Sequence, residues 1–292
     1  MAGKERKIIN HPFLNKHTII GVILLTFGGF VFCEVLMGGV LGTVLGLLYM
    51  SINPGNSEMG TMILINVISI LSAFVLLAIF WRWFYPEYEG GLKGGRKVVF
   101  WTIISIAIVT GLLIVNLLTD DGSLGWPSAV NIATALMAGV CEEAFFRGIG
   151  ASYLMRQWRD KNDVLKVMIV TSLLFAVIHC FNMIGGAPLA MTIVQIINAF
   201  SMGCLFCGFF LRSGNLIPAM VFHTLNDVFA FMRVDSIGEG GIYNSDVTVS
   251  WQMLVVLAVL SVIYISITLF LTRPSVRDEL RELWDHKWVN PN

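Results

Sequence analysis

The sequence predicts an all-α, polytopic membrane protein built as a bundle of about eight transmembrane helices. Of the 292 residues, 56% are hydrophobic and only 13% are charged, whereas soluble domains carry roughly 25% charged residues. The mean hydropathy is +0.78, and the apolar residues gather in segments long enough to cross a bilayer. The formal net charge is zero, so the chain lacks the basic excess that binding to nucleic acid requires. The expected surroundings are therefore a lipid bilayer, and nucleic acid is not an expected partner.

Eight apolar segments have the length of a membrane-spanning helix. A bilayer core of about 30 Å requires about 20 apolar residues of helix, because lipid offers no partner to a free backbone N–H or C=O group. The first segment is too long for one straight crossing and carries Glu34, so we expect it to tilt or to extend beyond the bilayer. The seventh segment is short and rich in polar residues. The approximate limits are 18–50, 58–84, 98–119, 127–155, 164–182, 188–211, 214–233 and 248–272.

The basic residues predict the orientation, because positively charged loops stay on the cytosolic side of a membrane. With eight spans, Arg147 lies within a span and Arg233 falls on one side, while the other 17 of the 19 basic residues fall on the opposite side. We therefore expect both termini to lie in the cytosol. The 17 residues are Lys4, Arg6, Lys7, Lys16, Arg82, Lys93, Arg96, Lys97, Arg156, Arg159, Lys161, Lys166, Arg212, Arg273, Arg277, Arg281 and Lys287.

One membrane domain is predicted between two cytosolic tails. Residues 1–17 form the N-terminal tail, residues 18–272 form the membrane domain with its polar motifs at about 127–233, and residues 273–292 form the C-terminal tail. Apolar side chains in the C-terminal tail recur on one helical face, with charges on the other, which is typical of an amphipathic helix on a membrane surface. These apolar residues are Val276, Leu280, Leu283, Trp284 and Trp288.

Seven ionisable side chains lie within the predicted spans. Such groups cost about 3 kcal/mol each on insertion scales, so they usually mark function. All but Glu34 belong to the fourth, fifth and seventh segments, and Asn226 adds an amide beside them. Glu34 itself is expected to be a packing or gating contact. The seven are Glu34, Glu142, Glu143, Arg147, His179, His223 and Asp227.

The fourth segment carries two adjacent glutamates and an arginine. Glu143 and Arg147 are four residues apart, with the glutamate first, so they are expected to form an ion pair on one helical face. Glu142 lies about 100° further around the helix and has no partner on it. A carboxylate without a cation in a medium of low polarity is suited to act as a base. We therefore expect a structural role for the pair and a catalytic role for Glu142.

The two intramembrane histidines lie at the depth of Glu142. His179 follows Phe175 by four residues, and His223, Asn226 and Asp227 share one face of the seventh segment. Counting helix rise from the nearest cytosolic basic residue places Glu142, His179 and His223 about 21, 20 and 17 Å deep. Because unrelated structural polar groups need not share a depth, this layer favours a functional site.

A glutamate, two histidines and an adjacent amide or carboxylate suit the hydrolysis of a peptide bond by activated water. Glu142 can take a proton from water while His179 orients it. His223, with Asn226 or Asp227, can donate hydrogen bonds to the developing oxyanion. The same side chains also suit a zinc site formed by Glu142, His179 and His223. Two competing functions are a non-enzymatic scaffold whose polar layer joins helices, and a proton-coupled transporter.

The order of these motifs resembles the CPBP family of CAAX proteases and bacteriocin-processing proteins, which includes the Rce1-like type II CAAX prenyl endopeptidases, also called Abi proteins. The resemblance covers about residues 127–233 and rests on three motifs, Glu142-Glu143-x-x-x-Arg147, Phe175-x-x-x-His179 and His223-x-x-x-Asp227. It implies an intramembrane endopeptidase in which Glu142 activates water, His179 assists it, and His223 stabilises the oxyanion together with residue 227. The family is described both as metalloproteases and as glutamate-dependent proteases without metal, so zinc stays open.

One position departs from the family pattern. Many members carry Asn where this chain has Asp227, and an ionised aspartate donates no hydrogen bond. Three roles remain open: Asp227 is protonated, Asp227 orients His223, or Asn226 supplies the amide. The resemblance implies a membrane-embedded or lipidated peptide substrate, either a CAAX-type protein or a bacterial leader, pheromone or bacteriocin peptide. For a bacterial protein it implies the plasma membrane, with bacteriocin immunity as the non-enzymatic function.

Overall fold

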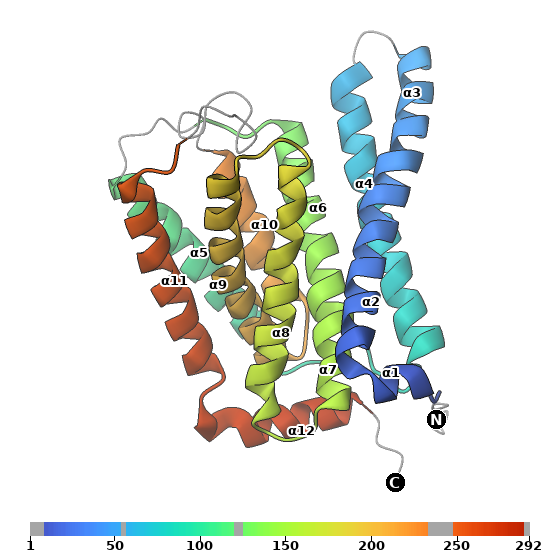
Figure 1. The fold of residues 1–292 in the computed structure, drawn as a ribbon, viewed down its shortest axis with the longest axis vertical. Coiled ribbons are helices and arrows are strands. Elements are labelled where there is room, and N and C mark those ends of the chain that lie inside the picture. The colour runs from blue at the N-terminus through green and yellow to red at the C-terminus, as the bar shows by residue number, and fades with distance from the viewer. Residues whose placement is uncertain (1–8, 54–56, 120–124, 233–247, 289–292) are drawn as a thin grey trace.

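A computed structural model describes residues 9–53, 57–119, 125–232 and 248–288, and in these ranges the chain is helical with no named strand (Figure 1). The predicted all-α class is therefore confirmed. The helices that carry the argument are α1 (Pro12–Lys16), α2 (Thr18–Phe30), the π-helix η1 (Val31–Gly42), α3 (Thr43–Ile52), α4 (Ser57–Ile79), the π-helix η2 (Phe80–Phe84), α5 (Val98–Thr119), α6 (Ala129–Glu143), the π-helix η3 (Ala144–Ala151), α7 (Ser152–Gln157), α8 (Asp163–Ile178), the 3₁₀-helix η4 (His179–Met183), α9 (Leu189–Ser213), α10 (Ile217–Phe231), α11 (Trp251–Leu271), the 3₁₀-helix η6 (Pro274–Val276) and α12 (Arg277–Lys287).

The N-terminal hairpin begins with one continuous rod. Helices α2, η1 and α3 run together through Thr18–Ile52, which is 35 residues or about 52 Å of helix. This length exceeds a bilayer core of about 30 Å, and α3 and the start of α4 stand beyond the other helices (Figure 1). The first segment is therefore too long for one straight crossing, as expected, and whether it tilts or extends beyond the bilayer stays a prediction. Close packing against α4 depends on glycines spaced four apart, because a Cβ atom at any of them would collide with an α4 side chain; these are Gly38, Gly42 and Gly46.

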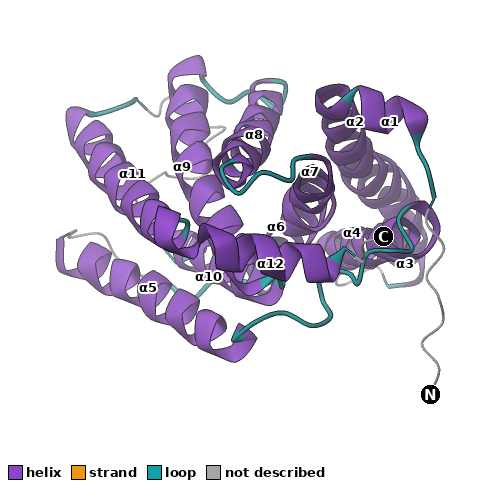
Figure 2. Ribbon diagram, turned by 90° about the horizontal axis from the view of Figure 1, so that it is seen from below, coloured by secondary structure: helices purple, strands orange, loops and turns teal. Residues whose placement is uncertain are grey.

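The second part of the molecule surrounds two central helices. Helix α9 packs against α8 and α11, and α10 packs against α5, α6 and α9. Seen from the end of the bundle, α9 lies between α8 and α11 (Figure 2). The turn between them is tight: Gly214 ends α9 with φ 65°, a left-handed conformation that glycine adopts without strain. Pro218 then lies in the first turn of α10, where its missing N–H costs nothing.

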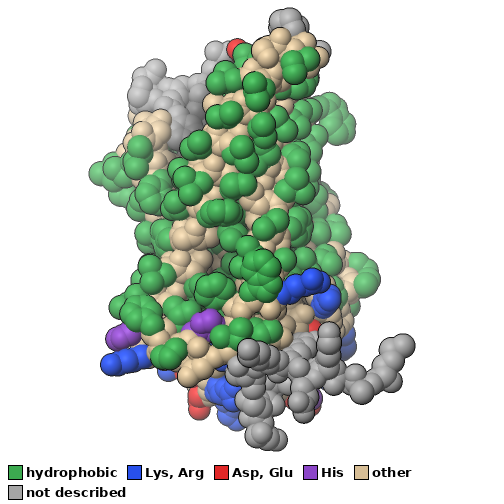
Figure 3. All heavy atoms as spheres, turned by 90° about the vertical axis from the view of Figure 1, so that its right-hand side faces the viewer, with side chains coloured by type: hydrophobic (Ala, Val, Ile, Leu, Met, Phe, Trp, Pro, Cys, Tyr) green, Lys and Arg blue, Asp and Glu red, His purple; other side chains and the backbone are tan. Residues whose placement is uncertain are grey.

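Seven helices in the described ranges are long and apolar enough to cross a membrane. They correspond to seven of the eight predicted spans. The remaining predicted span is α10, which is helical but covers only 15 residues, because the tight turn at Gly214 delays its start. The outer face is apolar: hydrophobic side chains cover it, and the Lys and Arg side chains gather toward one end (Figure 3). The chain is an integral, multi-pass membrane protein, while the orientation of its termini stays a prediction.

The C-terminal helix departs from the expectation that its apolar face lies on lipid. Helix α12 crosses one end of the bundle (Figure 2), and Trp284 is fully buried against the protein. The Trp284 Nε1–H group donates a hydrogen bond to the Leu211 carbonyl oxygen at 3.1 Å. Trp288 stacks on Tyr88 with ring centroids 4.3 Å apart. Tyr88, in the loop after η2, thus supplies an aromatic partner to the C-terminal segment. The spacing of apolar residues along this segment could not reveal that contact.

Truncating Trp284 is expected to destabilise the protein strongly. Replacing a buried Trp by Ala costs about 3–5 kcal/mol, through lost burial and the cavity that remains. We expect the Trp284→Ala variant to have a clearly lower melting temperature in detergent than the wild type. The Glu282→Ala variant changes an exposed side chain on the same helix and should melt as the wild type does. Equal melting of both variants would show that α12 is not docked.

Candidate active site

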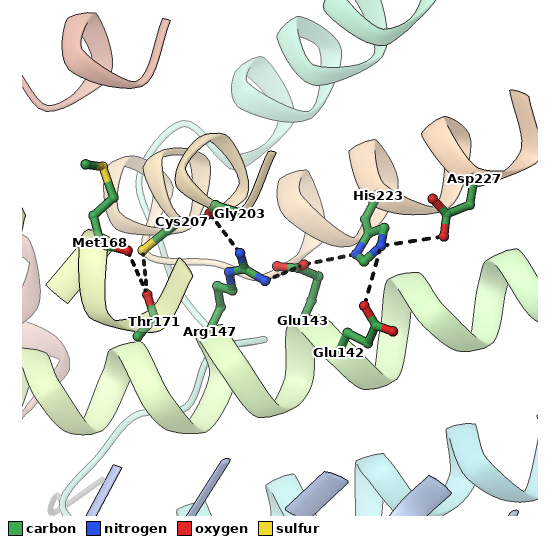
Figure 4. A network of polar contacts seen from close by, with 9 residues as sticks. All are labelled: Glu142, Glu143, Arg147, Met168, Thr171, Gly203, Cys207, His223 and Asp227. Atoms are coloured by element: carbon green, nitrogen blue, oxygen red, sulfur yellow. Dashed lines mark hydrogen bonds and ion pairs between the residues drawn. The ribbon is translucent and has the colours of Figure 1, made fainter. Parts of the chain in front are cut away.

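The two glutamates of the fourth span lie where an α-helix becomes a π-helix. Glu142 and Glu143 end α6, and η3 continues the rod with Arg147 one turn further on. Such π-helical segments occur often at functional sites. All three side chains point toward α9 and α10 (Figure 4).

The predicted ion pair between Glu143 and Arg147 is present and fully buried. Arg147 Nη1 lies 2.9 Å from Glu143 Oε1, and both side chains are 0% exposed. Arg147 Nη2 also donates a hydrogen bond to the Gly203 carbonyl oxygen at 2.8 Å. The guanidinium lies over the rings of Phe175 and Phe206, at 4.7 and 5.4 Å from their centroids. The arginine is therefore held by partners from three helices.

His223 is the centre of the polar network. Its Nδ1 atom lies 3.0 Å from Glu143 Oε1, and an ionised carboxylate can only accept, so Nδ1 carries the proton of this hydrogen bond. Its Nε2 atom faces the other two carboxyls, 3.8 Å from Glu142 Oε2 and 3.5 Å from Asp227 Oδ2 (Figure 4). Phe206 stacks on the imidazole with ring centroids 4.7 Å apart. The ring is thereby fixed with one nitrogen on the ion pair and the other toward Glu142.

The contact between Glu143 and His223 is not predicted by residue spacing in the sequence. The spacing along the fourth segment identifies only Arg147 as a partner of Glu143. One oxygen of Glu143 serves both partners, from its own rod and from α10. Sequence spacing reveals contacts within one helix, but it does not show which face of another helix comes near. The shared depth of the two segments is the sequence signal that points to this contact.

His179 lies in the same region but outside the hydrogen-bonded network. It begins η4, directly after α8, and no hydrogen bond in the described ranges joins it to Glu142. Phe175 contacts both histidines, with ring centroids 5.4 Å from His179 and 5.8 Å from His223. The structure therefore brings Glu142, His223 and Asp227 together directly, and it links His179 to them through an aromatic ring.

Asn226 and Asp227 make different contacts. Asn226 Nδ2 donates a hydrogen bond to Asp227 Oδ1 at 3.3 Å, while the other oxygen of Asp227 faces His223. Of the three roles left open for residue 227, this geometry matches the orientation of His223. Asn226 is linked to the imidazole through the aspartate.

Zinc, which the sequence analysis left open, has no assembled ligand set in the part of the chain that the structure describes. No group of three or more His, Cys, Asp or Glu side chains there is arranged to hold a metal ion. His223 Nδ1 is engaged by Glu143, and its Nε2 atom faces Glu142 and Asp227. Within the described ranges, Glu142, His179 and His223 are not gathered around one point as metal ligands are.

Glu34 reaches this region from the N-terminal rod. It lies on η1, and its Oε1 atom is buried without a hydrogen-bond partner among the described residues. It is also close enough to Glu142 for the two carboxyls to interact electrostatically. Helix counting cannot show this proximity, because it does not reveal that the first span lies beside the fourth.

The close approach of α6 and α10 sets the geometry of the site. Gly139 lies one turn before Glu143, and a Cβ atom there would come within 2.8 Å of the Thr224 backbone nitrogen and 3.0 Å of its Cα atom. We therefore expect Gly139→Ala to push the helices apart, with a stability cost of about 1–3 kcal/mol and a loss of activity. Gly111→Ala is the matched control, because no atom lies within 4 Å of its added Cβ. Thermal melting of both variants checks this, and an unchanged Gly139→Ala variant would contradict the close packing.

One family model matches the part of the chain that carries these side chains. The family model described as type II CAAX prenyl endopeptidase Rce1-like matches residues 123–229. This stretch is just over a third of the chain and contains Glu142, His179, His223 and Asp227. No curated protein matches the chain. Over residues 123–229 this chain is thus similar to the Rce1-like type II CAAX prenyl endopeptidases.

Proposed function

We propose that the chain is an intramembrane endopeptidase that hydrolyses a peptide bond of a membrane-associated peptide with water activated by Glu142. The observation that carries this proposal is the convergence of Glu142 and Asp227 on one nitrogen of His223, with the other nitrogen held by Glu143. If the polar layer were only structural, each polar group would need no more than a hydrogen-bond or ion-pair partner. A base beside an anchored imidazole supplies the groups that amide hydrolysis requires.

In the proposed reaction, Glu142 takes a proton from water, and the hydroxide oxygen attacks the carbonyl carbon of the scissile bond. The negative charge that develops on the carbonyl oxygen is stabilised by the Nε2–H group of doubly protonated His223. Glu142 then gives its proton to the leaving nitrogen as the C–N bond breaks. His179, whose ring contacts Phe175, is proposed to orient the water. The products are a carboxylic acid and an amine, and transfer of the acid proton to the amine gives a carboxylate and an ammonium group.

Two residues hold His223 in this role. Glu143, itself balanced by Arg147, fixes the Nδ1 side of the ring, and Asp227 lies on the Nε2 side. Both carboxyls stabilise a positively charged imidazole, which donates to an oxyanion more strongly than a neutral one. We propose Glu143, Arg147, Asp227 and, through Asp227, Asn226 as positioning residues.

The proposed substrate is a peptide embedded in or attached to the membrane. The relation to CAAX prenyl endopeptidases suggests a CAAX-type protein, and bacterial leader, pheromone or bacteriocin peptides share the same location. The non-enzymatic scaffold is not favoured by the family match.

The experiment that tests this function compares peptides released from native membranes. Membranes containing the wild-type chain and membranes containing Glu142→Gln are incubated in parallel, and the soluble fractions are analysed by mass spectrometry. We expect a set of peptides with a common cleavage position that is present only with the wild type. The proposal fails if both membranes release the same peptides while both proteins are folded and inserted.

A further inference from the structure

Two cavities adjoin one another between α9 and α11, in the membrane part of the described chain. The first has a volume of about 220 Å³ and also reaches α5 and α10, with Asn198 and Asn226 among its lining residues. The second has a volume of about 240 Å³ and is lined by Gln195 and Asn198 among apolar side chains. Asn198 and Leu260 line both cavities. Side-chain amides therefore follow the two cavities along α9.

The first cavity ends beside the proposed site of hydrolysis. Asn226 lines this cavity and donates a hydrogen bond from Nδ2 to Asp227 Oδ1 at 3.3 Å, while Asp227 Oδ2 lies 3.5 Å from His223 Nε2. The Asp227 side chain is 26% exposed and the Glu142 side chain is 18% exposed, so neither carboxyl is sealed within the protein. A peptide that lies in the cavity is therefore led to the groups that are proposed to hydrolyse it.

Both cavities lie on the side of the site that faces away from α12. Every residue of α9 from Ser201 to Leu211 is buried, and Trp284 of α12 donates a hydrogen bond to the Leu211 carbonyl oxygen at the end of this stretch. Gln195 and Asn198 lie in the first half of α9 and are only partly buried. In Figure 1, α12 crosses the lower end of the bundle and the first half of α9 lies toward the upper end. The cavities therefore extend toward the end of the bundle opposite α12.

The distance from the cavities to the site corresponds to a few residues of an extended peptide. Phe206 stacks on His223 and so marks the level of the site on α9. Asn198 precedes Phe206 by eight residues, which is about 12 Å of helix. Because an extended chain covers about 3.3–3.6 Å per residue, Asn198 lies about three or four substrate residues from the scissile bond.

The two amides on α9 have hydrogen-bonding groups to spare among the described residues. Asn198 Nδ2 donates to the sulfur of Met202 at 3.3 Å, and a thioether sulfur is a weak acceptor. Gln195 Oε1 accepts a hydrogen bond from Asn182 Nδ2 at 2.7 Å. Asn198 Oδ1 and Gln195 Nε2 make no hydrogen bond within the described ranges. The pair therefore offers one acceptor and one donor group to a molecule in the cavities.

A peptide that is hydrolysed inside a membrane needs such groups. Its scissile carbonyl must be accessible to water, so the segment around it is extended and has lost the hydrogen bonds of a helix. Lipid offers no replacement for these bonds, and unpaired peptide groups are costly there. A side-chain amide carries the same kinds of donor and acceptor as a peptide group, so it can pair with the main chain of peptides that differ in sequence.

We propose that Asn198 and Gln195 bind the main chain of the substrate peptide, about three or four residues from its scissile bond. Asn198 Oδ1 accepts a hydrogen bond from a peptide N–H group, and Gln195 Nε2 donates one to a peptide carbonyl oxygen. The proposal rests on the proposed function, because the bound peptide is the one that Glu142 hydrolyses. Apolar side chains of the peptide pack against the remaining walls of the cavities. Selection then depends on an extended segment more than on any one side chain.

The test uses peptides derived from a cleavage site found in native membranes. One peptide bond at a time is replaced by an ester, up to about four residues on either side of the scissile bond. The ester removes the N–H donor and weakens the carbonyl acceptor, while it keeps the shape of the chain. Purified wild-type protein in liposomes should cleave the peptide with the ester at one of these positions with about tenfold lower kcat/KM than the all-amide peptide, mainly through a higher KM. Cleavage at the scissile amide is followed by mass spectrometry.

Variants of the two amides show whether they cause this loss. In Asn198→Leu, which keeps the shape of the side chain, the ratio of kcat/KM for the amide and ester peptides should fall to about twofold or less. Gln195→Met should lower the ratio at the same or the adjacent position, and it decides the question if Asn198→Leu does not fold. Asn66→Leu is the matched control and should keep the wild-type ratio. Asn66 is a buried amide on α4 that is hydrogen-bonded to Thr134 and lines neither cavity.

The outcomes separate this inference from the proposed function. The inference is overturned, while the protease function stands, if no ester lowers wild-type cleavage or if both amide variants keep the wild-type ratio. Amides that only joined helices, or cavities that held lipid, would change the cleavage of amide and ester peptides equally and so leave the ratio unchanged. If wild-type protein cleaves none of the peptides and releases none from native membranes, the proposed function fails and the inference falls with it.

Discussion

Glu142→Gln is expected to lower kcat for peptide cleavage by about 10²- to 10⁴-fold, the range that a general acid–base residue contributes. The amide has the shape of the carboxylate, so it can keep the contact with His223, but it cannot take a proton from water at neutral pH. KM should change little, because Glu142 acts on water rather than on the bound peptide. Steady-state kinetics of the purified protein in liposomes measure both quantities.

A matched variant separates the loss of a base from the loss of a charge. Glu58→Gln removes one carboxylate from an exposed position and should keep the wild-type kcat. Folding of Glu142→Gln is checked by its melting temperature, which should lie near that of the wild type because the ion pair of Glu143 and Arg147 remains. Cleavage by folded Glu142→Gln at the wild-type rate would remove Glu142 from the catalytic role.

Arg147→Met is expected to destabilise the fold by about 3–5 kcal/mol, the cost of breaking a buried ion pair by removing one partner. The change leaves the fully buried Glu143 without its arginine and the Gly203 carbonyl oxygen without its donor. Methionine fills part of the same volume, so the loss reflects charge more than packing. We expect a sharp fall in melting temperature, measured in detergent by thermal unfolding.

Two further variants show whether the ion pair acts as a unit. Adding Glu143→Gln to Arg147→Met removes the uncompensated charge and should restore part of the stability, but not cleavage, because His223 loses its anionic partner at Nδ1. Lys161→Met breaks an exposed pair with Asp278 and should cost at most about 1 kcal/mol. If Arg147→Met were as mild as Lys161→Met, the buried pair would not hold the site together.

Features that depend on one helix could be predicted from the sequence. The spacing of Glu143 and Arg147 fixes their contact, because residues four apart lie on one face. The spacing of His223 and Asp227 does the same on α10. The predicted spans follow in the same way from length and polarity, and seven of them are long apolar helices in the described ranges. The seventh predicted span, which corresponds to α10, is clearly longer than that helix.

Features that depend on two helices could not be predicted in the same way. Glu143 meets His223 because Gly139 lets α6 approach α10 closely, and no periodicity encodes that distance. Glu34 comes near Glu142 only because the N-terminal rod packs beside the fourth span. The apolar face of α12 was visible in the sequence, but whether lipid or Tyr88 covers it depends on tertiary structure. These contacts all arise from packing rather than from local sequence.

We propose that side chains alone, with Glu142 as the base, activate water for peptide hydrolysis inside the membrane. The most direct measurement is the cleavage rate of an identified peptide by purified wild-type and Glu142→Gln proteins in liposomes, after treatment with a metal chelator and again after addition of zinc. The account predicts that chelation leaves the wild-type rate unchanged and that Glu142→Gln is inactive with or without zinc. Loss of wild-type cleavage on chelation with recovery on zinc addition, or undiminished cleavage by Glu142→Gln, would contradict it.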